Sequence, residues 1–70
     1  MIALLDVVAL LEDVPEVDLR RGQVGTVVEL LAPDVYEVEF ADKNGHTKTS
    51  LAVRSDQLLV LHYPEAANAV

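Results

Sequence analysis

The chain contains no cysteine and no tryptophan, and it has only three aromatic residues, Tyr36, Phe40 and Tyr63. Without cysteine, disulfides and thiolate metal sites are excluded. With so few aromatic side chains, we expect a core built from valine and leucine. Half of the 70 residues are apolar, which suffices for one small domain. A domain of this length buries only about 60% of the surface that its unfolded chain exposes.

Basic residues are also scarce, because five lysines and arginines stand against 12 acids and give a net charge of −7. This charge repels phosphate backbones and anionic lipid, which argues against nucleic acids and membrane surfaces as partners. The acids gather at Glu12, Asp13, Glu16 and Asp18. Solubility is the ordinary reason for such a charge, and a functional acidic loop is the alternative.

The chain also lacks a long uninterrupted apolar segment. Its opening, MIALLDVVALL, is too short to span a bilayer and is interrupted by Asp6. It has neither the basic start nor the cleavage signature of a secretion signal. We therefore expect a buried strand here and a cytoplasmic protein.

Five short segments have the pattern of β-strands. In residues 35–40 apolar and polar residues alternate strictly, which places Tyr36, Val38 and Phe40 on one face. Proline at position 15 predicts a loop over residues 13–22 with Leu19 turned inward. Residues 7–12 are also compatible with a helix. The expected strands are residues 7–12, 24–31, 35–40, 49–53 and 58–62, with a turn at 32–34 and a single 3₁₀ turn at 54–57.

The pair Asn44-Gly45 is the strongest short signal for a β-hairpin, because both residues tolerate positive φ. If these two residues form the loop, Lys43 pairs with His46. The same register places apolar groups together on one face, whereas a slip of one residue would turn Leu51 outward. The predicted pairs are Phe40 with Thr49, Val38 with Leu51, and Tyr36 with Val53.

The order of these elements predicts an all-β fold, a small five-stranded SH3-like barrel. Its two specific features are the long loop after the first strand and the 3₁₀ turn before the fifth. A barrel also covers strand edges that an open sheet would expose. We expect the barrel over residues 1–62 and a flexible C-terminal tail over residues 63–70.

Several stretches resemble known families of small barrels. The pattern GQVGTVVELLAPDVYEVEF at residues 22–40 resembles the KOW motif of ribosomal and transcription proteins. The wider pattern, VGTV, YxVxF and SDQL, is similar to small barrel subunits of photosystem I and to the C-terminal barrel of the nitrile hydratase β chain. LLDVVALLED, LRRGQVGTVVE, YEVEF and DQL together resemble a bacterial family of short stand-alone proteins labelled only as a domain of unknown function. That resemblance implies the fold and no activity, although an antitoxin-like or paired-partner role is suspected for such proteins.

The chain lacks residues that two known functions of small barrels require. Signalling SH3 domains carry ALYDY and adjacent tryptophans, but this chain has ALLED at residues 9–13 and no tryptophan. The aromatic groove that binds polyproline helices is therefore not expected. RNA-binding KOW modules carry basic residues near the motif. Here Arg20 and Arg21 are followed by several acids, which are Glu29, Asp34, Glu37 and Glu39.

The chemistry-bearing residues do not form a catalytic pattern. Gly22 and Gly25 precede a strand rather than a helix, which indicates a turn and close packing at a barrel corner, not a phosphate loop. His46 and His62 are too few for a metal site, which needs three or four ligands. Ser50 and Ser55 have no evident activating partners. Glu37 and Glu39 are expected on the solvent-exposed face of the sheet, across from Lys48 and Arg54. We expect no enzyme, no cofactor and no metal.

Adjacent apolar pairs on strands give the best functional clue. Neighbouring strand residues point to opposite faces, so one of Leu30 and Leu31, and one of Val60 and Leu61, should face outward unless a bulge or barrel closure hides both.

Arg20 and Arg21 either pair with the loop acids or hold a partner's carboxylate. The first hypothesis is a non-catalytic module that binds a protein partner or itself. The alternative is a KOW-like nucleic-acid contact through Arg20, Arg21, Lys43 and Lys48. The candidate partner surface comprises Glu12, Asp13, Glu16, Asp18, Arg20, Arg21, Leu31 and Leu61.

Overall fold

The computed structural model describes residues 2–41, 44–45 and 48–62. The predicted pairing of Lys43 with His46 and the predicted tail over residues 63–70 lie outside these residues. The described part forms five strands and two 3₁₀ helices. The strands are β1 (Val7–Leu10), β2 (Val24–Ala32), β3 (Val35–Ala41), β4 (Lys48–Arg54) and β5 (Leu58–Val60), and the 3₁₀ helices are η1 (Pro15–Val17) and η2 (Ser55–Gln57).

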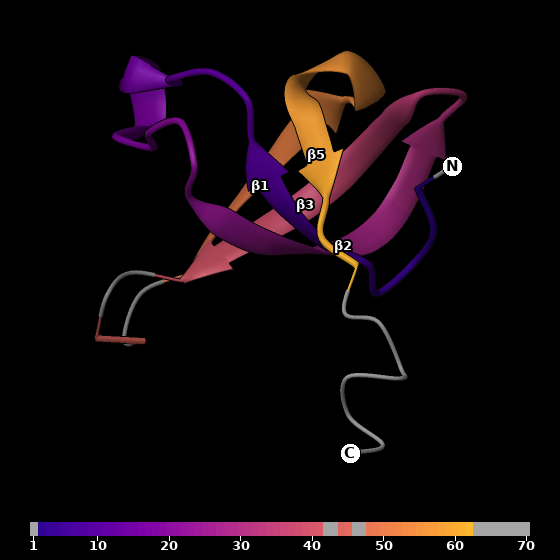
Figure 1. Cartoon of the computed structure of the whole chain (residues 1–70), viewed down its shortest axis with the longest axis horizontal. Coiled ribbons are helices and arrows are strands. Elements are labelled where there is room, and N and C mark those ends of the chain that lie inside the picture. Colours follow the sequence, from indigo (N-terminus) through magenta and orange to yellow (C-terminus); the bar gives the residue numbers. More distant parts are fainter. Residues whose placement is uncertain (1, 42–43, 46–47, 63–70) are drawn as a thin grey trace.

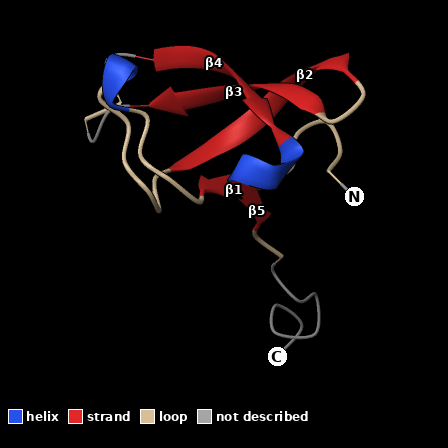
Figure 2. Ribbon diagram, turned by 90° about the horizontal axis from the view of Figure 1, so that it is seen from above, coloured by secondary structure: helices blue, strands red, loops and turns tan. Residues whose placement is uncertain are grey.

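The five strands form one antiparallel sheet in the order β4-β3-β2-β1-β5. The sheet curls so that β5 and β1 cross over the face of β3 and β4 (Figures 1 and 2). The long loop after β1 and the 3₁₀ helix η2 before β5 are both present. The fold is thus the small SH3-like barrel that the sequence predicts.

The predicted register of the β3–β4 hairpin is confirmed. Tyr36 pairs with Val53, Val38 with Leu51, and Phe40 with Thr49. Gly45 has a φ of +73°, as a turn glycine should. The alternation of β3 and the position of the Asn44-Gly45 pair therefore agree on one register.

The first and last strands are each two residues shorter than predicted. β1 ends at Leu10, because the Leu11 amide already donates to the carbonyl of Gln57 in η2 at 2.9 Å. β5 ends at Val60, although the Leu61 amide still donates to the Val7 carbonyl at 2.9 Å. The chain turns away from the sheet at both points, so an apolar run continues past the end of the strand.

Strand β2 is the longest, and its C-terminal half does not alternate. Its register with β3 shifts at Val28 and again at Leu31, which marks two β-bulges. Gly25 and Val27 are buried, but every residue from Val28 to Ala32 is exposed. Each bulge adds one residue to one strand and resets the phase of its side chains. For this reason both Leu30 and Leu31 are exposed, although strict alternation would bury one of them.

The core lies between the two halves of the curled sheet. Tyr36, Val38 and Phe40 all point into it, as the alternation of β3 predicts, and Leu19 joins them from the long loop. Phe40 is only 1% exposed. Apart from the two aromatic residues, the core is made of valine and leucine: Val8, Leu10, Leu19, Val27, Val38, Val53 and Leu58.

Candidate functional site

The long loop between β1 and β2 is internally folded. Val14 and Leu19 form an isolated bridge, in which the Val14 amide donates to the Leu19 carbonyl at 2.8 Å and the Leu19 amide returns a bond at 3.1 Å. Between them lies η1, which begins at Pro15 and ends at Val17, and Asp18 caps it with a left-handed φ of 58°. Leu19 then enters the core. The acids Glu16 and Asp18 are therefore exposed on a loop with a defined shape.

Side-chain hydrogen bonds close the base of this loop. Asp13 Oδ1 accepts a bond from the Arg21 amide at 2.8 Å, which joins the two ends of the loop. Glu12 Oε1 accepts a bond from Gln57 Nε2 at 2.7 Å, which joins the loop to η2. Two of the predicted partner residues, Glu12 and Asp13, thus have a structural role. Arg21 contacts this loop acid through its backbone amide, a contact that does not involve its guanidinium group.

The two arginines lie beside these acids. Within the part of the chain that the structure describes, the guanidinium groups of Arg20 and Arg21 form no ion pair. Both residues are exposed. They line an open depression of about 490 Å³ together with Leu11, Glu12 and Asp13. Four of the eight predicted residues therefore come together at the base of the loop.

A second surface lies at the turn between β2 and β3. Leu30 is 55% exposed and Leu31 is 43% exposed. With Ile2, Pro33 and Tyr36 they line a mainly apolar recess of about 390 Å³, which we call the aliphatic recess. On the side away from β3, the pairing of β2 with β1 ends at Thr26, and the last bonds there join Val27 to Leu5 and Asp6.

The long loop and the aliphatic recess lie at opposite ends of the molecule. In Figure 1 the loop with η1 is at the upper left, and the β2–β3 turn is at the upper right, near the N-terminus. Leu61 belongs to neither segment, because it directly follows β5, and it is half-buried. The structure therefore divides the predicted partner surface into an acidic end with two arginines and an aliphatic end with Leu31.

The glutamates of the sheet are arranged differently from the expected ion-pair ladder. Glu37 lies directly opposite Glu29 on β2, so two like charges form a cross-strand pair. Arg54 Nε pairs instead with Asp56 Oδ1 in η2 at 3.1 Å, and both of these side chains are exposed. The Lys48 side chain lies outside the described part. Arg54 therefore pairs with η2, and among the described side chains no cation pairs with Glu29 or Glu37, an arrangement that we call the uncompensated Glu29–Glu37 pair.

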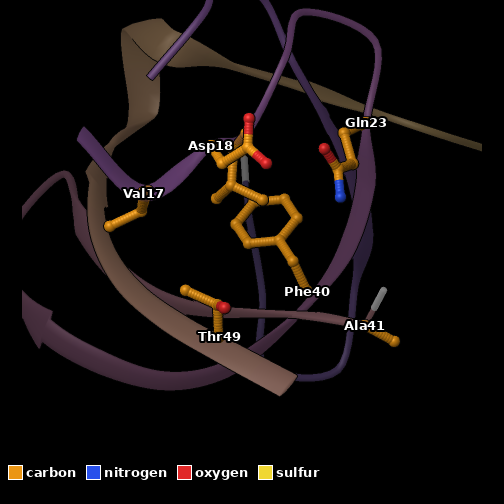
Figure 3. Close-up of a pocket in the computed structure, with 7 residues that line it drawn as sticks. Val17, Asp18, Gln23, Phe40, Ala41 and Thr49 are labelled. Atoms are coloured by element: carbon orange, nitrogen blue, oxygen red, sulfur yellow. The ribbon is translucent and has the colours of Figure 1, made fainter. Parts of the chain in front are cut away.

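A third feature is a small pocket between the long loop and the start of the β3–β4 hairpin (Figure 3). It measures about 160 Å³. The ring of Phe40 lies at its centre, and residues of the loop, of the end of β3 and of the start of β4 surround that ring. Its lining residues are Val17, Asp18, Leu19, Gln23, Phe40, Ala41 and Thr49.

The two glycines of the GxxG pattern have structural roles, as predicted. Gly22 has a φ of +89°, and its amide donates to the Leu10 carbonyl at 2.7 Å where the loop enters β2. Gly25 lies opposite Phe40, and an added Cβ would stand 2.7 Å from that ring.

The described residues contain neither a metal-binding cluster nor a membrane-spanning helix. No group of three or more histidine, cysteine, aspartate or glutamate side chains within them could hold a metal ion. His62 is exposed, and His46 lies outside the described part. Among the same residues, no helix has the length and apolar character needed to cross a membrane.

Sequence reasoning missed the extent of the aliphatic recess and the pocket over Phe40. The adjacent leucines signalled an outward residue, but the two bulges that expose both were not visible in the residue pattern. Leu11 and Leu59 are also exposed, although each lies in or beside a strand. The pocket forms only when the folded loop meets the hairpin, so no local pattern could reveal it.

Comparison with known proteins identifies a family but no activity. A family model described as a domain of unknown function, DUF4926, matches residues 4–60. This range covers all five strands. No curated protein and no solved structure matches the chain.

Proposed function

The chain belongs to the DUF4926 family, and we propose that it is a non-catalytic protein-interaction module of the cytoplasm. The aliphatic recess carries this proposal. A small monomeric protein rarely exposes contiguous large aliphatic side chains without a partner that covers them. Leu30 and Leu31 are both more than two-fifths exposed and lie beside Ile2, Pro33 and Tyr36.

The partner we propose is a different protein with a basic surface. The chain carries a net charge of −7, so two copies repel each other whereas a basic protein is attracted. Asp34 lines the aliphatic recess itself, and the uncompensated Glu29–Glu37 pair lies on the same two strands. The partner would insert apolar side chains into the recess and place lysine or arginine near these carboxylates.

Affinity capture from the source organism with matched variants tests this proposal. Leu30→Glu places a charge in the recess, whereas Leu59→Glu changes a leucine of almost equal exposure, 53%, that does not line it. We expect wild type and Leu59→Glu to recover the same protein, and Leu30→Glu to recover about tenfold less, as for a central interface residue. Equal recovery by both variants, or no enriched protein together with a monomer by light scattering, would contradict the proposal.

We further propose that the partner is encoded by a neighbouring gene. The resemblance to short stand-alone proteins supports an antitoxin-like role towards the product of a neighbouring gene. We expect the captured protein to be encoded beside this one and to slow growth when expressed alone. Co-expression of the wild-type chain should restore growth, and co-expression of Leu30→Glu should not. Normal growth with the neighbouring protein alone would exclude the antitoxin-like role while leaving the interaction intact.

A KOW-like nucleic-acid contact is the alternative. The exposed guanidinium groups of Arg20 and Arg21, which form no ion pair with any described residue, favour it. The charge of −7 opposes it, because phosphate contacts need a basic surface. A gel-shift assay with single-stranded RNA at low salt separates the two functions. We expect no shift at high micromolar protein, and a shift that Arg20→Ala abolishes would favour the alternative.

A further inference from the structure

We infer that the pocket over Phe40, between the long loop and the β3–β4 hairpin, binds one lysine or arginine side chain of a partner protein. This inference rests on the proposed interaction function and adds the chemistry of a second contact. The pocket lies at the acidic end of the molecule, far from the aliphatic recess (Figure 1). A partner that occupies both sites would span the length of the barrel.

The floor of the pocket is apolar. The ring of Phe40 is 1% exposed, and Leu19 beside it is also buried. Figure 3 shows the ring at the centre, with Val17 and Thr49 towards one side of it and Gln23 on the other. Because this floor is itself buried, a ligand would touch the more accessible lining residues above it, which include Val17 and Ala41. The methylene stem of a lysine or arginine can pack against their apolar atoms while its charged end stays at the rim.

The rim of the pocket supplies the oxygen atoms that a cation needs. Asp18 is exposed, and within the described residues its carboxylate accepts no hydrogen bond. Gln23 Oε1 accepts a hydrogen bond from the Arg20 amide at a long 3.3 Å and from no other described residue. Thr49 adds a hydroxyl group. One carboxylate beside two neutral acceptors suits a single positive charge, and the charge of the whole chain favours the same ligand.

The geometry of the pocket is fixed before any ligand binds. The two hydrogen bonds between Val14 and Leu19 hold the loop, and the Asp18 amide donates to the Pro15 carbonyl at 3.2 Å. These bonds keep Asp18 in its left-handed conformation. The close approach of Gly25 holds the ring of Phe40 from behind. A preformed site loses less conformational entropy when it binds.

The size of the pocket limits the ligand to one side chain. Its volume of about 160 Å³ is well below the roughly 300–1,000 Å³ of sites for small molecules. A metal ion is a poor fit, because Asp18 is the only carboxylate among the described lining residues and metal sites need several ligands. The ligand is therefore a projecting part of a larger partner.

Nuclear magnetic resonance titration of the full chain tests the site directly. The probes are N-acetyl-arginine methylamide, its lysine counterpart, and the uncharged citrulline analogue, each added to the 15N-labelled protein at low salt. We expect the two cationic probes to shift the amide signals of Asp18, Leu19, Gln23 and Thr49 with a dissociation constant on the order of 1–10 mM. The citrulline probe should leave these signals unchanged. Equal shifts with citrulline, or no shifts at these residues, would overturn the inference.

Two variants of the same loop separate the pocket from the general charge of the protein. Asp18→Asn removes the carboxylate, and asparagine tolerates the left-handed backbone. Glu16→Gln removes the same charge from η1, but Glu16 does not line the pocket. We expect Asp18→Asn to weaken probe binding about fivefold, as for a partly exposed ion pair, and Glu16→Gln to have little effect. Equal weakening by both variants would contradict a specific site. Because Leu30→Glu leaves this pocket intact, failure here and failure of the proposed function are distinguishable.

Discussion

At the scale of single residues, Gly25 lies directly opposite Phe40 in the β2–β3 pair. An added Cβ would stand 2.7 Å from the ring and 2.8 Å from the Glu39 carbonyl oxygen. The ring is fully enclosed in the core and the carbonyl belongs to the strand backbone, so neither contact can relax easily. The glycine at this position is thus required by the packing of one aromatic ring.

Gly25→Ala should therefore destabilise the protein by about 2 kcal/mol, in the range of overpacked cores. For a domain of this size each kcal/mol corresponds to about 4–8 °C in Tm. Urea denaturation measures the change. Thr26→Ala is the control, because Thr26 is the next residue of β2 and is only half-buried. A loss no larger than that of Thr26→Ala would show that β2 and β3 can separate locally.

Leu5 gives a prediction of the opposite sign. It is 71% exposed and has a φ of 69°, a conformation that costs a leucine about 1–2 kcal/mol. Leu5→Asn should raise stability by about 0.5–1 kcal/mol, because asparagine adopts this conformation more readily. Leu4→Asn is the matched control, since Leu4 is also exposed and its φ is not positive. If both variants change Tm equally, the gain comes from lost surface hydrophobicity and not from relief of strain.

At the scale of elements, the β3–β4 hairpin was predictable and the C-terminal half of β2 was not. In the hairpin, the turn pair Asn44-Gly45 and the alternation of β3 specify the same register independently. In β2 the bulges at Val28 and Leu31 break the period of two, and nothing in the residue types marks a bulge there. The inward position of Leu19 was predicted, but η1 was not, because it depends on the Val14–Leu19 bridge.

The link between the long loop and η2 is a further element-scale feature that can be measured. Gln57 donates to Glu12 at 2.7 Å, and its Oε1 accepts a bond from the Arg54 amide at 2.9 Å. Gln57→Glu keeps the acceptor for Arg54 but places a second carboxylate against Glu12. We expect a loss of about 1 kcal/mol in the free energy of unfolding.

A reciprocal exchange isolates this contact. The double variant Glu12→Gln/Gln57→Glu again pairs one amide with one carboxylate, so most of the lost stability should return. Thermal unfolding of the wild type, both single variants and the double variant forms a double-mutant cycle. Additive losses would show that the two side chains do not interact in solution.

At the scale of the whole molecule, only part of the candidate surface was predictable. The grouping of Glu12 and Asp13 with Arg20 and Arg21 follows from sequence proximity and loop closure. The separation of this group from Leu31 follows from the barrel, in which β2 carries the chain from the loop end to the opposite end (Figure 1). Residue types alone do not give that distance, so the prediction from the sequence treated the two surfaces as one.

The excess of acids should also control stability. Repulsion among 12 acids opposed by five bases is long-ranged, and salt shortens that range from about 30 Å at 0.01 M to about 3 Å at 1 M. We expect sodium chloride to raise Tm by a few degrees between these limits. The uncompensated Glu29–Glu37 pair concentrates the effect, because like charges directly opposite each other on neighbouring strands are destabilising.

Glu37→Gln should therefore raise stability by about 0.5 kcal/mol at low salt and by less at high salt. Glu16→Gln changes the net charge equally but lies on an exposed loop, so it reports the long-range component alone. Calorimetry of the three proteins at both salt concentrations separates the two components. If Glu16→Gln stabilises as much as Glu37→Gln, the charge acts as a diffuse field and the Glu29–Glu37 pair has no special cost. A larger gain for Glu37→Gln would mean that this sheet face retains an unfavourable pair in the free protein, which a basic partner would relieve on binding.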